Sequence, residues 1–463
     1  MVHIKVKKGL DIPISGRPEG RAKPLVPGGE VSPLVIPHFV SLNVSEFDDV
    51  KFRLLVREGD SVKIGQPLAE DKSSPGRFFV APAAGVIKEI RRGLKRRLLD
   101  VVIEVAPTEE YVTFSHLNLQ TVSKEDLLAR LMEAGIFAKI HVRPFNFLAN
   151  PQHVPRSIFV KAVESAPFVP PAELQVIGHE KDFQTGLQAL TKLTPGKVHL
   201  VYRHDTYCKA FTEAENVEKH TVEGPHPVSN VSLHIQKIDP IKSAEDVIWT
   251  LNAHDVVCLG HLLNTGKIHN ERVISIAGPG VLEDRVGYFK AREGYPISAL
   301  VAGRIGKGLQ RLISGDPLMG HRVQVEDFLG FDDYVFCVVP ENTEREFVHF
   351  MGLGLNKYTF SRAYLSGHFR NPEREYAMTT NMHGEHRAFI DNTLYDKVMP
   401  LDISTMHLVK AVMAEDLDLA QYYGLLEVDP EDFALPTFVD PSKIEMVDII
   451  RQGLRRHAKE VLH

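Results

Sequence analysis

The sequence has 463 residues, of which 54 are Lys or Arg and 60 are Asp or Glu, so the formal net charge is −6. This length suggests about three domains, and without a basic excess nothing points to a nucleic-acid partner. The three cysteines, Cys208, Cys258 and Cys337, form no CxxC motif, which excludes a disulfide framework and an iron–sulfur cluster held by cysteines of this chain alone. With no signal peptide and no run of about 18 apolar residues, we expect a protein of the reducing cytoplasm without a membrane-spanning helix.

The first region, residues 1–115, is rich in Gly and Pro and carries short β-type runs at 53–72, 78–90 and 98–105. These runs predict a small β-domain of hairpins. Its segment 59–90 resembles lipoyl and biotinyl carrier domains, which are barrel-sandwich hybrids carrying a modified lysine at a tight turn. Lys72 is the candidate lysine, but the stretch that follows it is too long for the carrier hairpin. We therefore expect the barrel-sandwich fold without the modification.

The second region, residues 116–265, alternates between strand and helix patterns. A capping pair, Ser123 and Asp126, opens a predicted helix over 124–134, and Gly135 closes it. Further patterns predict strands at 157–163, 197–202 and 255–260 and helices at 180–193 and 243–252. Such alternation is typical of a parallel, Rossmann-like sheet.

The rest of the chain divides into a β-rich region, 266–345, and a region that ends in helices, 346–463. Strands are predicted at 272–278, 311–315 and 334–339, and helices within 404–426 and 444–462. No repeat array or low-complexity linker interrupts them.

Common catalytic motifs fit poorly. The segment 260–267 is one residue too long for a phosphate loop, and Ile268 stands where Ser or Thr would reach magnesium. His383 and His386 are three residues apart around an acid, but Gly384 favours a polar loop over a metal site. The basic run 91–97 is expected to form a solvated hairpin between two strands. Binding to anionic lipid or phosphate is the alternative.

Several motifs together resemble a known family, the A-type subunits of the sodium-translocating NADH:quinone oxidoreductases of bacterial respiration. They follow the family's order from about residue 8 to the C-terminus. The motifs are the segments 8–16, 59–90, 135–147, 224–227, 276–281, 396–403 and 424–443.

This resemblance implies a peripheral subunit on the cytoplasmic face of the bacterial inner membrane. The family's complex is a translocase that passes electrons from NADH to ubiquinone and exports sodium, and five other subunits are the implied partners. One of them is a membrane subunit with covalently bound FMN. The A-type member carries no flavin, iron–sulfur cluster or metal, and has been associated with ubiquinone binding. The isolated chain is therefore not expected to be catalytic.

A more distant resemblance, to NADH- and FMN-binding subunits of related complexes, implies the four-domain layout. It comprises a barrel-sandwich hybrid domain (1–115), a Rossmann-like domain (116–265), a β-grasp domain of the SLBB type (266–345) and a helical domain like a ferredoxin-like one (346–463). In those relatives a glycine-rich loop follows the helix that matches 124–134. Here only Gly135 remains, and bulky residues follow, so the nucleotide loop is expected to be filled.

The same resemblance implies that cluster ligands have been lost from the helical domain. Pro436 and Asp440 stand where the last two cysteines of a CxxCxxCxxxCP pattern are expected, and Met399 precedes Pro400 where Cys-Pro is expected. These side chains cannot assemble a cluster.

For quinone contacts the candidates lie in 137–147. Phe137, Phe145 and Phe147 can stack on a quinone head, and His141 or Arg143 can hydrogen-bond its carbonyl. The alternative is that the aromatic rings are core residues and that Arg143 pairs with a carboxylate. A purely structural subunit, with quinone held by a membrane subunit, remains the alternative function.

Overall fold

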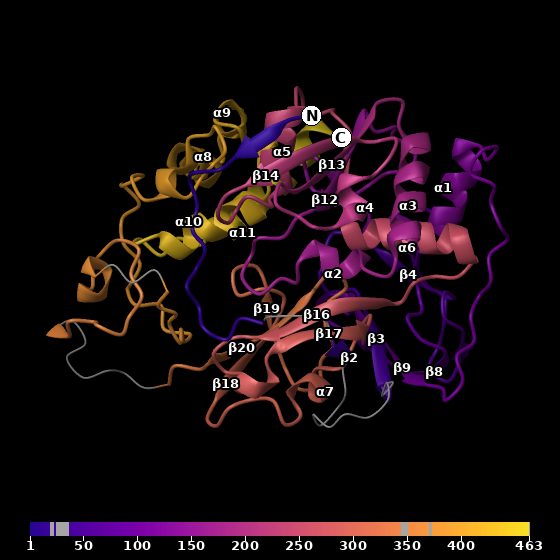
Figure 1. Cartoon of the computed structure of the whole chain (residues 1–463), viewed down its shortest axis with the longest axis horizontal. Coiled ribbons are helices and arrows are strands. Elements are labelled where there is room, and N and C mark those ends of the chain that lie inside the picture. Colours follow the sequence, from indigo (N-terminus) through magenta and orange to yellow (C-terminus); the bar gives the residue numbers. More distant parts are fainter. Residues whose placement is uncertain (19–22, 25–36, 344–350, 370–372, 463) are drawn as a thin grey trace.

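The computed structural model describes residues 1–18, 23–24, 37–343, 351–369 and 373–462. Four sheets and their helices build a mixed α/β molecule in which the barrel-sandwich, Rossmann-like and β-grasp units are all present (Figure 1), as the sequence predicts. The predicted boundary between 345 and 346 falls outside the described residues.

The barrel-sandwich unit consists of two small antiparallel sheets around an apolar core. One has the order β3-β9-β8-β5 and the other β4-β6-β7. Their bounds are β3 (Phe39–Asn43), β4 (Phe52–Leu54), β5 (Ser61–Val62), β6 (Pro67–Asp71), β7 (Phe78–Val80), β8 (Gly85–Arg92) and β9 (Leu98–Val105). Phe47 meets Phe79 and Phe331 edge to face in this core, which a residue from the β-grasp region thus helps to complete.

The α/β unit is built on a seven-stranded sheet with the order β1-β14-β13-β12-β15-β10-β11. The strands are β1 (His3–Lys5), β10 (His141–Arg143), β11 (Phe147–Leu148), β12 (Ser157–Ala162), β13 (Lys197–Arg203), β14 (Glu218–Glu223) and β15 (Ile248–Asn252). From β1 to β15 neighbouring strands pair in parallel, and β10 and β11 are antiparallel. This order places a switch point between β12 and β15, where the strand order reverses direction.

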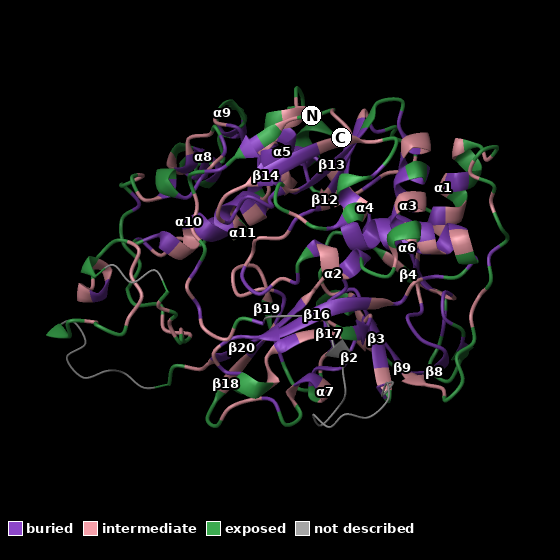
Figure 2. Cartoon of the chain, in the orientation of Figure 1, coloured by how far each residue is buried: buried purple, intermediate pink, exposed green. Residues whose placement is uncertain are grey.

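Helices cover both faces of this sheet. They are α1 (Lys124–Glu133), α2 (Ala172–Val176), α3 (Glu180–Leu193), α4 (Lys209–Thr212), α5 (Val231–Ile238) and α6 (Ala253–Thr265). Side chains of α1, α3 and α6 share one apolar core with the sheet, while α5 and the C-terminal helices share the other. Figure 2 shows the buried residues gathered along these layers.

Two predicted elements of this unit are wrong. The predicted helix 243–252 ends in strand β15, and the predicted strand 255–260 lies within α6. Asn252 and Asp255 form a capping box, so the helix begins at Ala253. Every residue from Ala253 to Gly260 is buried, and an apolar run buried on all sides cannot be assigned to strand or helix by its periodicity.

The β-grasp unit is a six-stranded sheet with the order β19-β18-β20-β16-β17-β2. Its elements are β2 (Lys23–Pro24), β16 (Glu271–Ala277), β17 (Gly287–Arg292), β18 (Gln310–Ser314), β19 (His321–Val323), β20 (Val335–Pro340) and the helix α7 (Ile297–Val301). Ile297 and Leu300 of α7 close the core over the sheet.

The C-terminal unit contains α8 (Thr405–Met413), α9 (Leu417–Tyr422), α10 (Ala434–Val439) and α11 (Met446–Val461). Their apolar side chains join the core on the β1 side of the α/β sheet. Short 3-10 turns connect them, among them η8 (Pro430–Phe433), which packs on α11.

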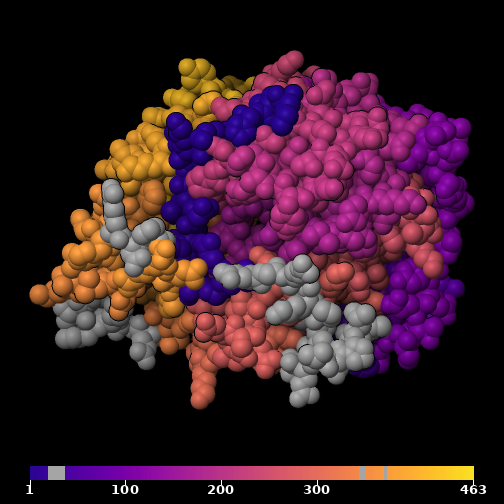
Figure 3. Space-filling view, viewed as in Figure 1, coloured from indigo at the N-terminus to yellow at the C-terminus, as the bar shows by residue number. Residues whose placement is uncertain are grey.

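Residues 3–16, which we call the strap, run along the surface and join three units (Figure 3). The strap opens with β1 on the edge of the α/β sheet. The amide of Gly9 donates to the carbonyl of Lys397 (3.0 Å), and the amide of Gly278 donates to the carbonyl of Gly16 (2.9 Å). A Cβ at Gly16 would lie 2.4 Å from the Gly278 backbone, so only glycine allows this approach.

Candidate functional site

A cavity of about 320 Å³ lies at the switch point of the α/β sheet. Its wall includes Lys161 and Glu164 at the end of β12 and Asn252 at the end of β15. The β-grasp unit adds Asp332, Asp333 and Tyr334, and the C-terminal unit adds Glu431. In open α/β sheets, ligands bind where the carboxyl ends of strands diverge at such a point.

The two lysines of the cavity are already neutralised. Lys161 Nζ lies 3.0 Å from Glu164, and Lys139 Nζ lies 2.7 Å from Glu293, which Arg272 approaches at 3.3 Å. Burial lowers the pKa of Lys161, but Glu164 and Glu431 raise it by more, so it stays charged. Neither lysine is a free anchor for a phosphate.

Carboxylates crowd the cavity and several resist ionisation. Burial, opposed by Lys139, raises the pKa of Asp255 to about 7, and Asp332 adds to the rise. Burial, opposed by Lys161, also raises the pKa of Glu431 to about 8, and neighbouring Asp429 and Asp432 add to it. A neutral carboxylic acid can donate a hydrogen bond, which an ionised one cannot.

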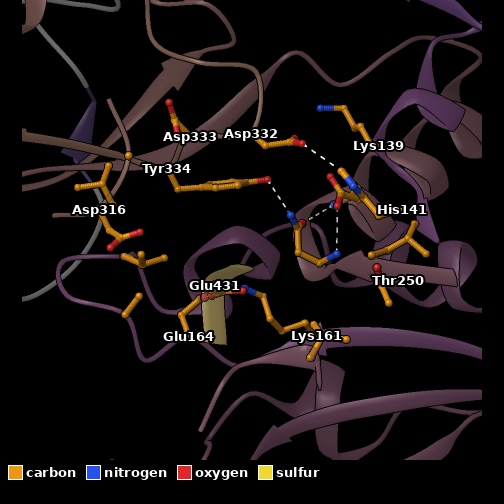
Figure 4. A pocket seen from close by; sticks show the side chains of 18 of the residues that line it. Lys139, His141, Lys161, Glu164, Thr250, Asp316, Asp332, Asp333, Tyr334 and Glu431 are labelled. Atoms are coloured by element: carbon orange, nitrogen blue, oxygen red, sulfur yellow. Dashed lines mark hydrogen bonds and ion pairs between the residues drawn. The ribbon is translucent and has the colours of Figure 1, made fainter. Parts of the chain in front are cut away.

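Hydrogen-bond donors of the cavity wall have spare capacity. His141 Nε2 lies 3.6 Å from Asp332, while its buried Nδ1 has no hydrogen-bond partner among the described residues. The hydroxyl of Tyr334 accepts from Asn252 Nδ2 at 3.2 Å, which leaves its own hydrogen free to donate. Figure 4 shows the Tyr334 ring reaching toward the His141 side of the cavity.

The protonation of these two donors follows from their surroundings. Burial lowers the pKa of His141, but Asp332, Asp255 and Asp429 raise it by more, so the ring holds its second proton more tightly than a free histidine. Burial and the nearby Asp255 raise the pKa of Tyr334 well above its ordinary value. The Tyr334 hydroxyl therefore keeps its proton, and the shift at His141 favours the doubly protonated ring, in which both nitrogens donate.

Among the five quinone candidates from the sequence, only His141 lines this cavity. Phe137 is fully buried against Trp249 at 5.4 Å, on the α1 side of the sheet. Phe145 and Phe147 stack at 6.1 Å on the opposite side. Arg143 is buried, donates to the Ser232 hydroxyl at 2.7 Å and lies 4.0 Å from Asp429.

The sequence reasoning missed Asp255, Tyr334 and Glu431, which come from three different units. A signal was present for part of the set. Lys161 and Glu164 close a predicted strand, and Asp332 and Asp333 precede another, so charged groups stood at strand ends. The contribution of Glu431 depends on how the C-terminal unit packs, which no local pattern encodes.

The loop after α1 turns into the interior of the molecule. Gly135 has a φ of 74° and leads into the 3-10 turn η2 (Ile136–Lys139), whose four residues are all buried. A Cβ at Gly135 would lie 2.9 Å from the Val80 side chain of the barrel. This turn packs into the interior and presents no open row of amides.

The positions that resemble cluster ligands are interior contacts. Asp440 is fully buried and accepts from the Tyr395 hydroxyl (2.6 Å) and from the amides of Ser442 (2.8 Å) and Ile444 (2.7 Å). Met399 and Pro436 are also buried, Met399 within the apolar core that the C-terminal helices share with the sheet.

The remaining motifs fall on ordinary structure. Segment 260–267 lies in α6 and its C-cap, Gly266. His383 and His386 are exposed in an irregular stretch. Lys72 is exposed directly after β6, at the start of its turn. Residues 91–97 join β8 to β9 as predicted, through the 3-10 turn η1 (Leu94–Arg96).

In the described part of the chain, no helix is both long and apolar enough to cross a membrane.

Three family models match the chain. They are the NqrA N-terminal barrel-sandwich hybrid domain over residues 4–106, the NqrA second alpha/beta domain over 122–268 and the NQRA C-terminal domain over 273–325.

Curated relatives match along almost the whole length. The A-type subunit of the Na(+)-translocating NADH-quinone reductase of Chlamydia pneumoniae is 37% identical and covers 99% of this chain and 98% of its own. The corresponding subunit of Tolumonas auensis is 37% identical, covering 98% and 99%.

Among solved structures, the NAD+-reducing [NiFe]-hydrogenase in its air-oxidized state matches 76% of this chain and 67% of its own at 11% identity, with a TM-score of 0.38. The H2-reduced state of such an enzyme matches 50% of this chain and 52% of its own at 12% identity, with a TM-score of 0.35.

Proposed function

The chain belongs to the NqrA family, the A-type subunits of the Na(+)-translocating NADH-quinone reductases, and from this premise we propose that it helps such a complex to bind ubiquinone. In this proposal it sits peripherally on the cytoplasmic face of the bacterial inner membrane. It joins five other subunits that together couple electron transfer from NADH to ubiquinone to sodium export. It carries no prosthetic group of its own and docks on the FMN-bearing membrane subunit.

The observation that carries the quinone proposal is the pair of spare donors in the switch-point cavity. A quinone head presents two carbonyl oxygens on opposite sides of an apolar ring. His141 Nδ1 and the Tyr334 hydroxyl are donors without an acceptor of their own, and Val169, Val231 and Val335 give the same cavity apolar wall. Ligand sites of this kind combine an apolar lining with a few polar groups that fix orientation.

Protonation favours a neutral, carbonyl-bearing ligand over an anion. The lysines of the cavity are paired and its carboxylates outnumber them, so a phosphate or carboxylate would meet repulsion. A carbonyl oxygen requires only donors, and reduction would place charge on that oxygen beside the His141 ring.

Docking is supported by apolar side chains exposed between residues 351 and 390, at one end of the long axis in Figure 1. They are Met351 (75% exposed), Leu353 (66%), Phe369 (64%) and Ile390 (76%). Exposed apolar side chains mark interaction surfaces where they gather, and we assign this segment to contact with the FMN-bearing membrane subunit.

The basic run 91–97 contributes less than its composition suggests. Arg91 pairs with Glu89 at 3.0 Å, and Arg97 donates to the Ser45 carbonyl. Arg92, Lys95 and Arg96 remain exposed around Leu94, which is 93% exposed. Contact with anionic lipid is proposed for these residues alone, at about 1 kcal/mol each.

The test is a titration of the purified full-length chain with a short-chain ubiquinone analogue. We expect saturable binding, and His141→Ala should weaken it about tenfold through the loss of one charge-assisted hydrogen bond. His116→Ala, at an exposed histidine remote from the cavity, is the matched control. Phe145→Ala should leave the affinity unchanged, because Phe145 lies outside the cavity wall.

Failure of the native chain to bind the analogue would contradict the quinone proposal. If the assembled complex then binds it with and without His141→Ala, a membrane subunit holds the quinone, and this chain serves assembly only.

A further inference from the structure

Three imidazoles gather where α3, α6 and the connection to β16 meet, and none of them lines the switch-point cavity. They belong to His179, which precedes α3, to His261 on α6 and to His269, in the connection from α6 to β16. One ring nitrogen of each lies within 4.8 Å of one nitrogen of each other. We propose that these three histidines form a zinc site in which a water completes the coordination.

The crossing of two helices builds the cluster. α3 and α6 touch through Gly186 and Gly260, where an added Cβ would lie 2.2 Å from the Val256 carbonyl oxygen and 1.7 Å from that of Asp182, respectively. Because no side chain separates the backbones there, His261 lies next to Asp182 and the start of α3. The connection from α6 then brings the ring of His269 to 4.7 Å from that of His179 and 5.2 Å from that of His261.

Asp182 is placed as the carboxylate that orients metal-binding histidines. Its Oδ2 lies 2.9 Å from His261 Nδ1 and 3.6 Å from His179 Nδ1, while Asn264 donates to its Oδ1 at 2.7 Å. A carboxylate on Nδ1 fixes the tautomer and leaves Nε2 with its lone pair. Burial raises the pKa of Asp182, but Asn264 and His261 lower it by more, so it is ionised as this role requires.

His269 is available as the third ligand. Within the described residues, no hydrogen bond reaches its imidazole, which lies against the rings of His179 and His261. Its ring nitrogens therefore have no other partner in that part of the chain that a metal ion would have to displace.

The spacing suits zinc with little movement. Zn–N bonds of about 2.0–2.1 Å place tetrahedral ligand nitrogens roughly 3.4 Å apart, so the rings need to approach by about 1.4 Å at most. All three side chains are partly exposed, which lets a hydrated ion enter and a water remain. Three imidazoles and one water form the ligand set of open zinc sites.

A second trio, His254, Cys258 and Glu293, also has ligand atoms in reach of one another. Its chemistry differs, because Glu293 is neutralised by Lys139 at 2.7 Å and Arg272 at 3.3 Å. Burial raises the pKa of the Cys258 thiol, and Glu293 and Asp255 add to the rise against the effect of Lys139. Two buried cations beside this trio exclude a divalent ion, so the proposal is limited to the three histidines.

Bound zinc would tie the start of α3 to α6 and to the strand β16 that begins the β-grasp unit. The site would thus stabilise the junction between two units of the fold. It is independent of quinone binding, since none of its residues lines the switch-point cavity.

The experiment uses the full-length chain without a polyhistidine tag, stripped with EDTA and titrated with Zn2+ against a chromophoric chelator. We expect one zinc per chain. His261→Ala and His269→Ala should weaken binding at least about 100-fold, and Asp182→Asn about 10- to 100-fold. His116→Ala, at an exposed histidine outside the cluster, should bind as the native chain does.

Cobalt gives a second measurement that does not depend on affinity. Co2+ in the native chain should show the intense visible bands of four-coordinate cobalt, and His269→Ala should abolish them. The melting temperature of the native chain should rise with Zn2+, while that of His269→Ala should not.

No stoichiometric zinc in the native chain, or zinc and cobalt bound equally by His261→Ala and His269→Ala, would overturn the proposal. If an alanine variant fails to fold in EDTA, Asp182→Asn gives the decision, because it leaves all three rings in place.

Discussion

Asp440 and Asp255 are both aspartates with almost no exposed surface, yet their surroundings are opposite. Asp440 accepts three hydrogen bonds, from one hydroxyl and two amides. Asp255, which is 3% exposed, caps α6 through Oδ2 while its buried Oδ1 has no hydrogen-bond partner among the described residues. Asp440, whose two oxygens both accept hydrogen bonds, stabilises the fold. Asp255, which has one oxygen without a hydrogen bond in the described part of the chain, lines the candidate site.

The largest effect should come from the satisfied aspartate. Asp440→Ala would leave the Tyr395 hydroxyl and two amides without an acceptor, and should lower the free energy of unfolding by about 3–5 kcal/mol. Urea unfolding followed by circular dichroism measures this. A loss below about 1 kcal/mol would show that the hydrogen bonds around Asp440 contribute little to the fold.

Replacing a carboxyl group of the cavity should have the opposite effect on the free energy of unfolding, because at high pH it should stabilise the chain. The pKa of Glu431 is raised to about 8, so the folded chain binds more protons than the unfolded chain between its ordinary value and that pH. The stability that the Glu431 carboxyl group contributes is therefore fully present below about pH 4.5 and is lost as the pH rises through about 8. Glu431→Gln cannot ionise and should gain on the order of 2 kcal/mol over the native chain at pH 9, since water screens part of the shift.

Urea unfolding of both chains at pH 5 and pH 9 measures this difference. Glu326→Gln, at an exposed glutamate, is the matched control, and its free energy of unfolding should equal that of the native chain at both pH values. If the free energy of unfolding changed equally between pH 5 and pH 9 in the native chain and in Glu431→Gln, the raised pKa of Glu431 would be contradicted.

The smallest effect on stability is expected for Tyr334→Phe, which should weaken ligand binding while leaving the fold almost as stable. Tyr334→Phe removes the free hydroxyl and the weak acceptor for Asn252, so it should cost stability no more than about 1 kcal/mol. Binding of the ubiquinone analogue should weaken about fivefold. An unchanged affinity together with a large loss of stability would show that Tyr334, like Asp440, stabilises the fold and does not bind the ligand.

Much of the architecture was predictable because it depends on local chemistry. The helix 124–134 has its cap in Ser123 and its stop in Gly135, and the structure ends it at Glu133. The strand 98–105 has the predicted bounds. The errors at 243–260 arose where burial on all sides removed the polar face that distinguishes helix from strand.

The candidate site was far less predictable. All the candidate quinone contacts predicted from the sequence belong to 137–147, but Phe137 and Phe145 lie in the cores on opposite faces of the sheet. Phe137 lies in the turn η2 and Phe145 in the turn between β10 and β11, so neither position follows from the alternation of side chains along a strand. The cavity is instead assembled from the ends of β12 and β15 and from two other units, which only the tertiary fold brings together.

The strap has a consequence for the order in which the chain folds. Its strand β1 pairs with Thr221–Glu223 of β14, and the amide of Gly9 donates to the carbonyl of Lys397. Contacts this distant in the chain form late, because much of the chain must be ordered first. During synthesis, β1 can pair once β14 has emerged, whereas the bonds of Gly9 and Gly16 must wait for Lys397 and Gly278. The strap therefore closes only on a chain made past residue 397, and its attachment marks the point at which the units become one body.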